Sequence, residues 1–220
     1  MELLIKISLI IHVAAGFSAL VFGAIAFALK KNTPKHKPIG KIYFWCMTII
    51  FITAIFLSIT KGRIFFFYIA VFSYYSTLIA YRSLKLKNLH KGDGPYGIDW
   101  AIEIIAGLTF LGMMGFAVQI YFKHGNAGAI VPLIFGGMGV WGVSRNIQLF
   151  LKGPKETLYW YKKHIGNMMG SYIGAITAFL VNQSEHIPIN PTILWLAPTG
   201  IIVPIIIWEL KKVKTKPIEA

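Results

Sequence analysis

The sequence predicts an all-α fold: an integral membrane bundle of seven transmembrane helices, with the N-terminus outside and the C-terminus in the cytoplasm. The chain has 220 residues, of which 56% are hydrophobic and only 14% charged, whereas a soluble domain carries about a quarter charged residues. Its apolar residues gather in segments of about 20 residues, the length that a helix needs to cross the hydrocarbon core. Because the connections between these segments are short, we expect a single transmembrane domain over residues 1–220.

Seven apolar segments follow one another along the chain. We expect spans at 3–29, 38–60, 64–84, 99–122, 128–151, 164–183 and 192–210. The first apolar run is too long for the core of a signal peptide, so it is read as a span. A tight turn at Lys61-Gly62-Arg63 separates the second and third spans. Pro198 and Pro204 interrupt the seventh span, which predicts a kinked helix.

Small residues recur at helical spacing in two of these spans. They are Ala15, Ala19 and Gly23 in the first span and Gly166, Gly170, Gly174 and Ala178 in the sixth. Such rows let helix backbones approach closely in a membrane, where lipid gives helices no hydrophobic reason to associate. We therefore interpret both rows as packing seams.

The basic residues predict the orientation. Of the 22 lysines and arginines, only Lys6, Lys61, Arg63 and Lys123 fall on one side of the predicted membrane. The other eighteen follow the first, third, fifth and seventh spans: Lys30, Lys31, Lys35, Lys37, Lys41, Arg82, Lys85, Lys87, Lys91, Arg145, Lys152, Lys155, Lys162, Lys163, Lys211, Lys212, Lys214 and Lys216. Cytoplasmic loops carry the excess of positive charge, so we expect a multi-pass protein of the inner (plasma) membrane. Charge clusters between spans encode topology, so we expect the lipid bilayer, and not nucleic acid, as the partner.

Ionisable residues near or inside the spans are the candidate functional residues. His12 lies within the first span, and His36, Asp99, Glu103 and His164 all lie at predicted cytoplasmic helix ends. Imidazoles and carboxylates at one depth are suitable ligands for a divalent metal ion, so His36, His164, Asp99 and Glu103 form a candidate metal site. The same groups could form a proton relay.

A haem is the alternative cofactor. His36 and His164 could be its axial ligands, with His12 as a further candidate, and Gly40, one turn after His36, would leave room for a flat group. Arg145 and Asn146 at the end of the fifth span, and Tyr172 on the same helical stripe as His164, are candidate supporting residues.

Purely structural roles stay open for each of these residues. Asp99 and Glu103 are in the first turns of a helix, where acids favour the helix dipole. His36 belongs to a lysine-rich loop that water can solvate, and His12 can simply hydrogen-bond a neighbouring helix. The single cysteine, Cys46, excludes intramolecular disulfides and cysteine-rich zinc sites.

Three short segments resemble one family. His12-Val-Ala-Ala-Gly16, His36-Lys-Pro-Ile-Gly40 and the stretch His164–Tyr172 with Thr177-Ala-Phe179 are similar to an uncharacterised family of predicted bacterial multi-pass membrane proteins with His-xxx-Gly motifs. The resemblance implies a seven-helix membrane domain and histidines at the positions of His12, His36 and His164. The family often has an acid where this chain has Asn146, and it implies no activity.

Three functions remain open from the sequence. The first is a membrane enzyme or redox protein that holds a metal ion or haem near the cytoplasmic face. The second is a small-solute or proton-coupled transporter, which His12, the prolines of the last span and the glycine-rich fifth span favour. The third is a non-catalytic accessory subunit. The HExxH, Walker, GxSxG and CxxC patterns are all absent from the sequence.

Overall fold

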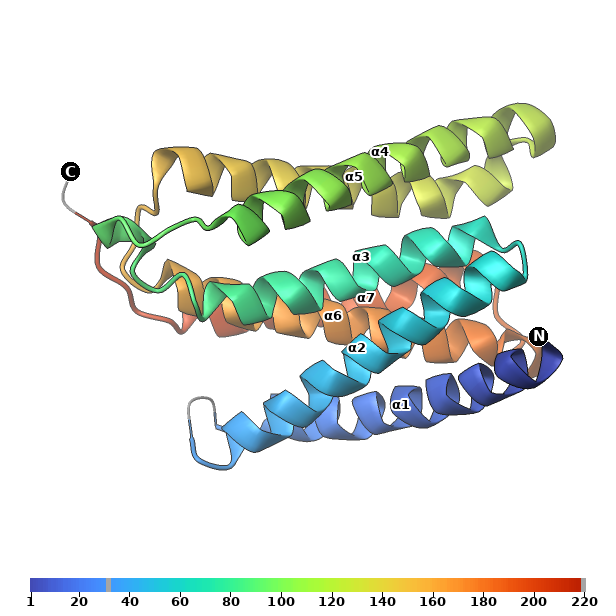
Figure 1. Ribbon diagram of the computed structural model, residues 1–220, viewed down its shortest axis with the longest axis horizontal. Coiled ribbons are helices and arrows are strands. Elements are labelled where there is room, and N and C mark those ends of the chain that lie inside the picture. The colour runs from blue at the N-terminus through green and yellow to red at the C-terminus, as the bar shows by residue number, and fades with distance from the viewer. Residues whose placement is uncertain (31–32, 219–220) are drawn as a thin grey trace. The chain divides into compact units, whose positions relative to one another are not determined.

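The computed structural model describes residues 1–30 and 33–218; Lys31, one of the predicted cytoplasmic cations, lies outside the described residues, as do Asn32, Glu219 and Ala220. Within the described residues the chain has seven α-helices, two short 3₁₀-helices and no strand (Figure 1). The helices are α1 (Glu2–Ala28), α2 (His36–Thr60), α3 (Ile64–Ser83), η1 (Leu89–Lys91), α4 (Gly97–His124), α5 (Asn126–Lys152), α6 (Tyr159–Asn182), η2 (Ser184–His186) and α7 (Pro191–Lys211).

Each predicted span coincides with one α-helix to within a few residues at most of its ends. The exception is the start of α6, at Tyr159, which extends five residues ahead of the predicted span. Six helices of the described part are long and apolar enough to cross a membrane: α1, α2, α3, α4, α5 and α7. Helix α6 is not among them, because Lys162, Lys163, His164 and Asn167 make its first half polar. The all-helical, membrane-type fold is thus confirmed, while the seventh span stays a prediction.

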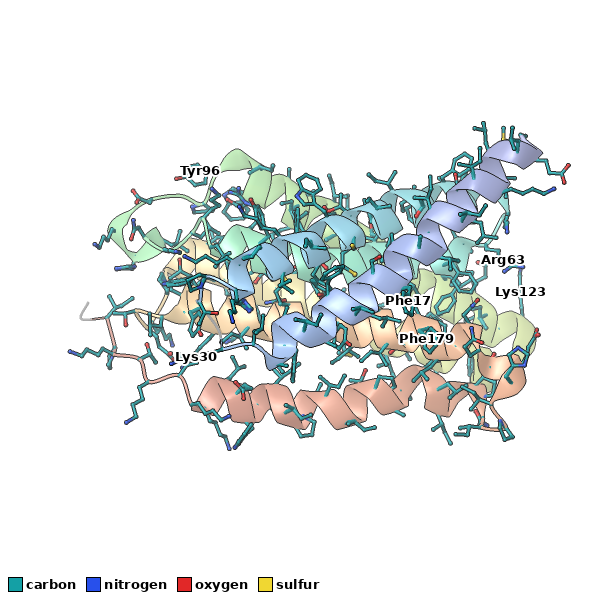
Figure 2. The ribbon with its side chains drawn as sticks, turned by 90° about the horizontal axis from the view of Figure 1, so that it is seen from below. Phe17, Lys30, Arg63, Tyr96, Lys123 and Phe179 are labelled. Carbon is teal, nitrogen blue, oxygen red and sulfur yellow. The ribbon has the colours of Figure 1, made fainter. Side chains whose placement is uncertain are left out.

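The helices expose large apolar side chains, as lipid-facing surfaces do. Ile10 and Phe17 on α1 and Leu108 on α4 are each about two-thirds exposed. Figure 2 labels Phe17 and Phe179 among these outward apolar side chains. A protein dissolved in water rarely exposes apolar surface so continuously, so the exposed side chains support the membrane interpretation independently of helix length.

The chain divides into two compact units. The first comprises Met1–Thr77 and Met168–Pro204, and the second comprises Leu78–Asn167 and Ile205–Ala220. Helices α3, α6 and α7 are each divided between the two units. The expected single domain over 1–220 stays a prediction, and each unit is described by itself.

In the first unit, α1 packs through its small residues. Ala15, Ala19, Gly23 and Ala26 are its buried positions, which confirms the seam predicted for this helix. A side chain at Gly23 would lie 2.6 Å from the Tyr172 ring, so only glycine admits this contact. Lys30 and Arg63 lie at opposite ends of this unit (Figure 2), as alternating spans require.

In the second unit, α4 and α5 lie side by side and antiparallel (Figure 1). The buried ring of Phe110 fills the space that the missing side chain of Gly139 leaves, since a Cβ there would lie 2.4 Å from the ring. Tyr96 and Lys123 mark opposite ends of α4 in Figure 2. The polar start of α4 therefore faces the same end of the unit as the last turns of α5.

Candidate functional site

A chain of three polar side chains joins α4, α5 and α6 in the second unit, with Glu103 and Asn146 buried and Lys163 half-buried. The Asn146 amide donates a hydrogen bond of 2.8 Å to Oε1 of Glu103. Its carbonyl oxygen accepts a hydrogen bond from the Lys163 ammonium. Glu103 is fully buried and Asn146 is 7% exposed. Since the amide nitrogen faces the carboxylate and the amide oxygen faces the ammonium, the two contacts fix the orientation of Asn146.

Helical register brings these three groups to one place. Asn146 lies on the buried face of α5, one turn from Val143 and one turn from Phe150, while its neighbour Arg145 is exposed. Lys163 lies one turn before Gly166, on the small-residue row of α6. Burial lowers the pKa of Lys163, which precedes the predicted span 164–183, to about 8, and the charges of Glu103 and Asp99 act in the opposite direction.

Asp99 forms a second, separate ion pair one helical turn before Glu103. The Arg82 guanidinium donates from Nε to Oδ1 at 2.7 Å and from its second nitrogen to Oδ2 at 2.9 Å. The backbone amide of Tyr96 also donates to Oδ2, at 2.9 Å. This is the bidentate geometry in which an arginine–carboxylate pair is strongest. Asp99 therefore ties the start of α4 to the end of α3, a structural role of the kind left open from the sequence.

His164 lies beside this network on α6 and in the same unit. Its Nδ1 is 3.0 Å from the backbone oxygen of Ala80 on α3. A carbonyl oxygen only accepts, so Nδ1 carries the proton in this contact. With Lys163 as its neighbour, His164 places the start of α6 against both α3 and α5.

His12 occupies the first unit, within α1. Its Nδ1 is 2.9 Å from the hydroxyl oxygen of Thr53 on α2. The Thr53 hydroxyl donates its own proton to the backbone of its helix, at 2.7 Å from Ile49 and 3.0 Å from Ile50. The hydroxyl oxygen must then accept from His12, so Nδ1 again carries the proton. The predicted hydrogen bond between His12 and a neighbouring helix is confirmed.

His36 also belongs to the first unit, at the start of α2. Its Nδ1 is 3.2 Å from the backbone oxygen of Ala26 near the end of α1. All three histidines singled out from the sequence are therefore Nδ1–H tautomers, each bonded to an oxygen of a neighbouring helix. In a neutral imidazole of this form, Nε2 is the acceptor nitrogen. Proteins use the Nδ1–H tautomer to orient a histidine whose Nε2 binds a metal.

The two remaining supporting candidates have separate environments. Tyr172 packs in the first unit and donates from its hydroxyl to the backbone oxygen of Leu20, at 3.0 Å. Close by, the Tyr43 hydroxyl shares a hydrogen bond of 2.8 Å with Ser171. Arg145 lies on the exposed face of α5 in the second unit. Of the supporting candidates, only Asn146 joins a buried polar network.

The structure thus separates the predicted site residues into two groups. Asp99, Glu103, Asn146 and His164 belong to the second unit, whereas His12, His36 and Tyr172 belong to the first. Among the residues that the structure describes, no three His, Cys, Asp or Glu side chains come together as a metal site would require. The metal site predicted from His36, His164, Asp99 and Glu103 therefore has no support from the structure.

Lys163 and Arg82 were counted in the sequence only as topology signals. In the structure Arg82 pairs with the buried Asp99 carboxylate, and Lys163 is linked to the buried Glu103 carboxylate through Asn146. One signal was present for Lys163: it continues the row of Gly166, Gly170 and Gly174 toward the N-terminus of α6. A lysine on a row predicted to be a packing seam would need a counter-charge. Arg82 gave no comparable signal, because it ends α3 among other cations.

No family model, curated protein or solved structure matches this chain. What can be said of its function therefore comes from the geometry of its own residues.

Proposed function

We propose that this protein is a proton-coupled carrier of small solutes, with Glu103, Asn146 and Lys163 as its proton-binding centre. The observation that carries the proposal is the complete burial of the Glu103 carboxylate and its connection through Asn146 to the Lys163 ammonium. Ionisable groups held inside a membrane protein are costly, and by default they mark ion or proton pathways.

The chemistry of the network suits reversible proton binding. With Lys163 protonated and Glu103 ionised, the two charges compensate each other across the Asn146 amide. Gain or loss of the Lys163 proton changes the net charge of this polar chain, which matters where water is excluded. The three groups come from α4, α5 and α6, so the protonation state of Lys163 alters the contact among these helices. A carrier uses such a link to couple proton binding to a change between two arrangements.

Flux measurements test the proposal. The purified chain is reconstituted into liposomes, and an imposed pH gradient drives uptake from a panel of monovalent cations, amino acids, sugars and organic acids. We expect pH-driven flux of at least one class, lost in Glu103→Gln and Lys163→Gln. Lys162→Gln is the matched control, because Lys162 is the adjacent lysine and pairs instead with Glu156. If no solute moves, or if K162Q and K163Q behave alike, the proposal fails.

A second candidate is a redox protein that holds a haem through a histidine Nε2. It is favoured by the shared Nδ1–H tautomer of His12, His36 and His164, since a haem needs only one or two axial ligands. An absorbance spectrum with elemental analysis of the membrane-purified chain tests it. A Soret band lost on substitution of one of the three histidines by alanine would support this candidate. If the protein shows neither solute flux nor a Soret band, the third function, a non-catalytic accessory subunit, is favoured.

For the orientation we propose an inner-membrane protein with its C-terminus in the cytoplasm. Eighteen of the 22 cations on alternate connections support it. A reporter fused after Ala220 that is active only in the cytoplasm is the expected result. A fusion that is active only in the periplasm would reverse the assignment.

A further inference from the structure

The C-terminal tail after α7 is an extended strip fixed against the connection between α5 and α6. The backbone amide of Thr157 donates to the oxygen of Lys216 at 3.1 Å, and the amide of Ile218 donates to the oxygen of Lys155 at 3.0 Å. Glu156 and Pro217 form an isolated antiparallel bridge. Figure 1 shows this tail beside the α5–α6 connection. All of these residues belong to the second unit.

The pairing decides which way the tail lysines point. Side chains on an extended backbone alternate between its two faces. The Thr215 hydroxyl accepts from the backbone amide of Leu158 at 3.3 Å, so Thr215 faces the connection. Its neighbours Lys214 and Lys216 face the other way and are both exposed, while Val213 and Thr215 are half-buried. The strip therefore presents a row of ammonium groups outward.

Most of the positive charge in this region is not neutralised. Lys212 pairs with Glu209 at 2.7 Å and lies over the Trp208 ring, and Lys162 pairs with Glu156. No carboxylate among the described residues pairs with Lys155, Lys214 or Lys216. The strip begins directly where α7, one of the six membrane-type helices, ends at Lys211. Trp160 and Trp208 of the same unit are the residue type that anchors proteins at headgroup depth.

We propose that the basic strip, defined as Lys155, Lys211, Lys214 and Lys216, is a docking surface for the phosphate headgroups of anionic phospholipids. Clusters of four to eight lysines or arginines immediately after a membrane helix attract anionic lipid, each cation adding to the affinity near the surface. The backbone pairing holds the lysines in place before lipid arrives, which lowers the entropic cost of binding. The strip is independent of the proton-binding centre and holds whether or not that proposal survives.

Native mass spectrometry of the full chain in mild detergent tests the proposal, with phosphatidylglycerol and phosphatidylcholine as probes. The test variant is Lys214→Gln with Lys216→Gln. The matched control is Lys35→Gln with Lys37→Gln, two exposed lysines of the first unit on the same predicted side of the membrane. We expect the tail variant to bind phosphatidylglycerol about tenfold more weakly, the control to bind it as the unsubstituted chain does, and phosphatidylcholine binding to be unchanged throughout.

A third variant separates charge from preorganisation. Thr215→Val keeps every lysine but removes the hydroxyl that accepts from Leu158, so a smaller loss of phosphatidylglycerol binding is expected. Far-ultraviolet circular dichroism checks that all variants keep their helices. Equal loss in the tail and control variants would show that only net charge matters and would overturn the proposal. Tripolyphosphate is added as a soluble phosphate probe. If the chain binds it in preference to phosphatidylglycerol, the proposal is overturned as well, because the ligand would then be a soluble anion.

Discussion

Asn146 links the buried Glu103 to the half-buried Lys163, donating to the carboxylate at 2.8 Å and accepting from the ammonium. An amide can bridge an anion and a cation in this way because its donor NH2 group and its acceptor oxygen lie side by side in one plane. The link makes the stability of α4, α5 and α6 depend on the charge of two residues that lie sixty positions apart in the chain.

Removing the cation alone is expected to be far worse than removing both charges. Lys163→Met leaves the Glu103 carboxylate buried without a counter-charge, so the free energy of unfolding should fall by about 3–5 kcal/mol. The double variant with Glu103→Gln should recover most of this loss. Thermal unfolding in detergent, followed by circular dichroism, measures both.

The matched control for this prediction is Lys162→Met. Lys162 pairs with a half-exposed carboxylate, Glu156, so its loss should cost at most about 1 kcal/mol. Strictly additive effects of the Glu103 and Lys163 substitutions would mean that the two charges are not coupled.

The same lysine predicts a pH dependence of stability. Its folded pKa, about 8, lies below the usual value of 10.5. Between these values the unfolded chain binds the proton that the folded chain has released, so the free energy of unfolding contributed by Lys163 rises with pH in this window. The unfolding temperature of the unsubstituted chain should therefore rise relative to that of the Lys163→Met variant between pH 8 and pH 10. A difference that stays constant over that range would contradict the assignment.

The Arg82–Asp99 pair should depend on the shape of the cation as well as its charge. Arg82→Lys keeps the charge but replaces a planar fork with a single ammonium group, so at least one of the two hydrogen bonds is lost. We expect a loss of about 1–3 kcal/mol in the free energy of unfolding. Arg63→Lys, at an exposed turn, is the control and should be neutral. Equal stability of both variants would show that the fork is not needed.

Two glycines of α5 give a direct test of the packing between α4 and α5. Gly139→Ala places a methyl group 2.4 Å from the Phe110 ring, whereas an alanine at Gly137 would meet nothing within 4 Å. Overpacking a buried contact costs about 1–3 kcal/mol, so the first variant should unfold at a lower temperature. The second should be neutral or slightly stabilised, since alanine favours helix. The reverse order would contradict the observed contact.

The hydrogen bond between α1 and α2 offers a spectroscopic prediction. Thr53→Val removes the hydroxyl that accepts from His12 Nδ1, so the imidazole should lose its fixed tautomer. Nitrogen NMR of labelled histidine should show a mixture in place of the Nδ1–H form, with a loss of stability of about 0.5–2 kcal/mol. Thr53→Ser keeps the hydroxyl and should keep the tautomer. An unchanged histidine spectrum in the valine variant would mean that another group holds the ring.

Within the described residues, the sequence by itself predicted all seven helices and the ends of most of them. For the six membrane-type helices the reason is that apolar runs of membrane length can satisfy their backbone groups only as helices. The asymmetric cations predict an orientation, and the spacing of Ala15, Ala19 and Gly23 correctly marked the buried face of α1. Glu103 and Asn146 were singled out because polar groups are rare in such segments.

Only the tertiary structure decided which of these groups meet. Periodicity places a residue on a face of its own helix, but it says nothing about which neighbour that face contacts. Lys163 and Arg82 therefore looked like ordinary topology signals until the fold brought Arg82 to Asp99 and linked Lys163 to Glu103 through Asn146. The predicted metal site of two histidines and two acids has no counterpart among the described residues. The direction of the tail lysines was equally hidden, because an extended strip has no preferred face until backbone hydrogen bonds choose one.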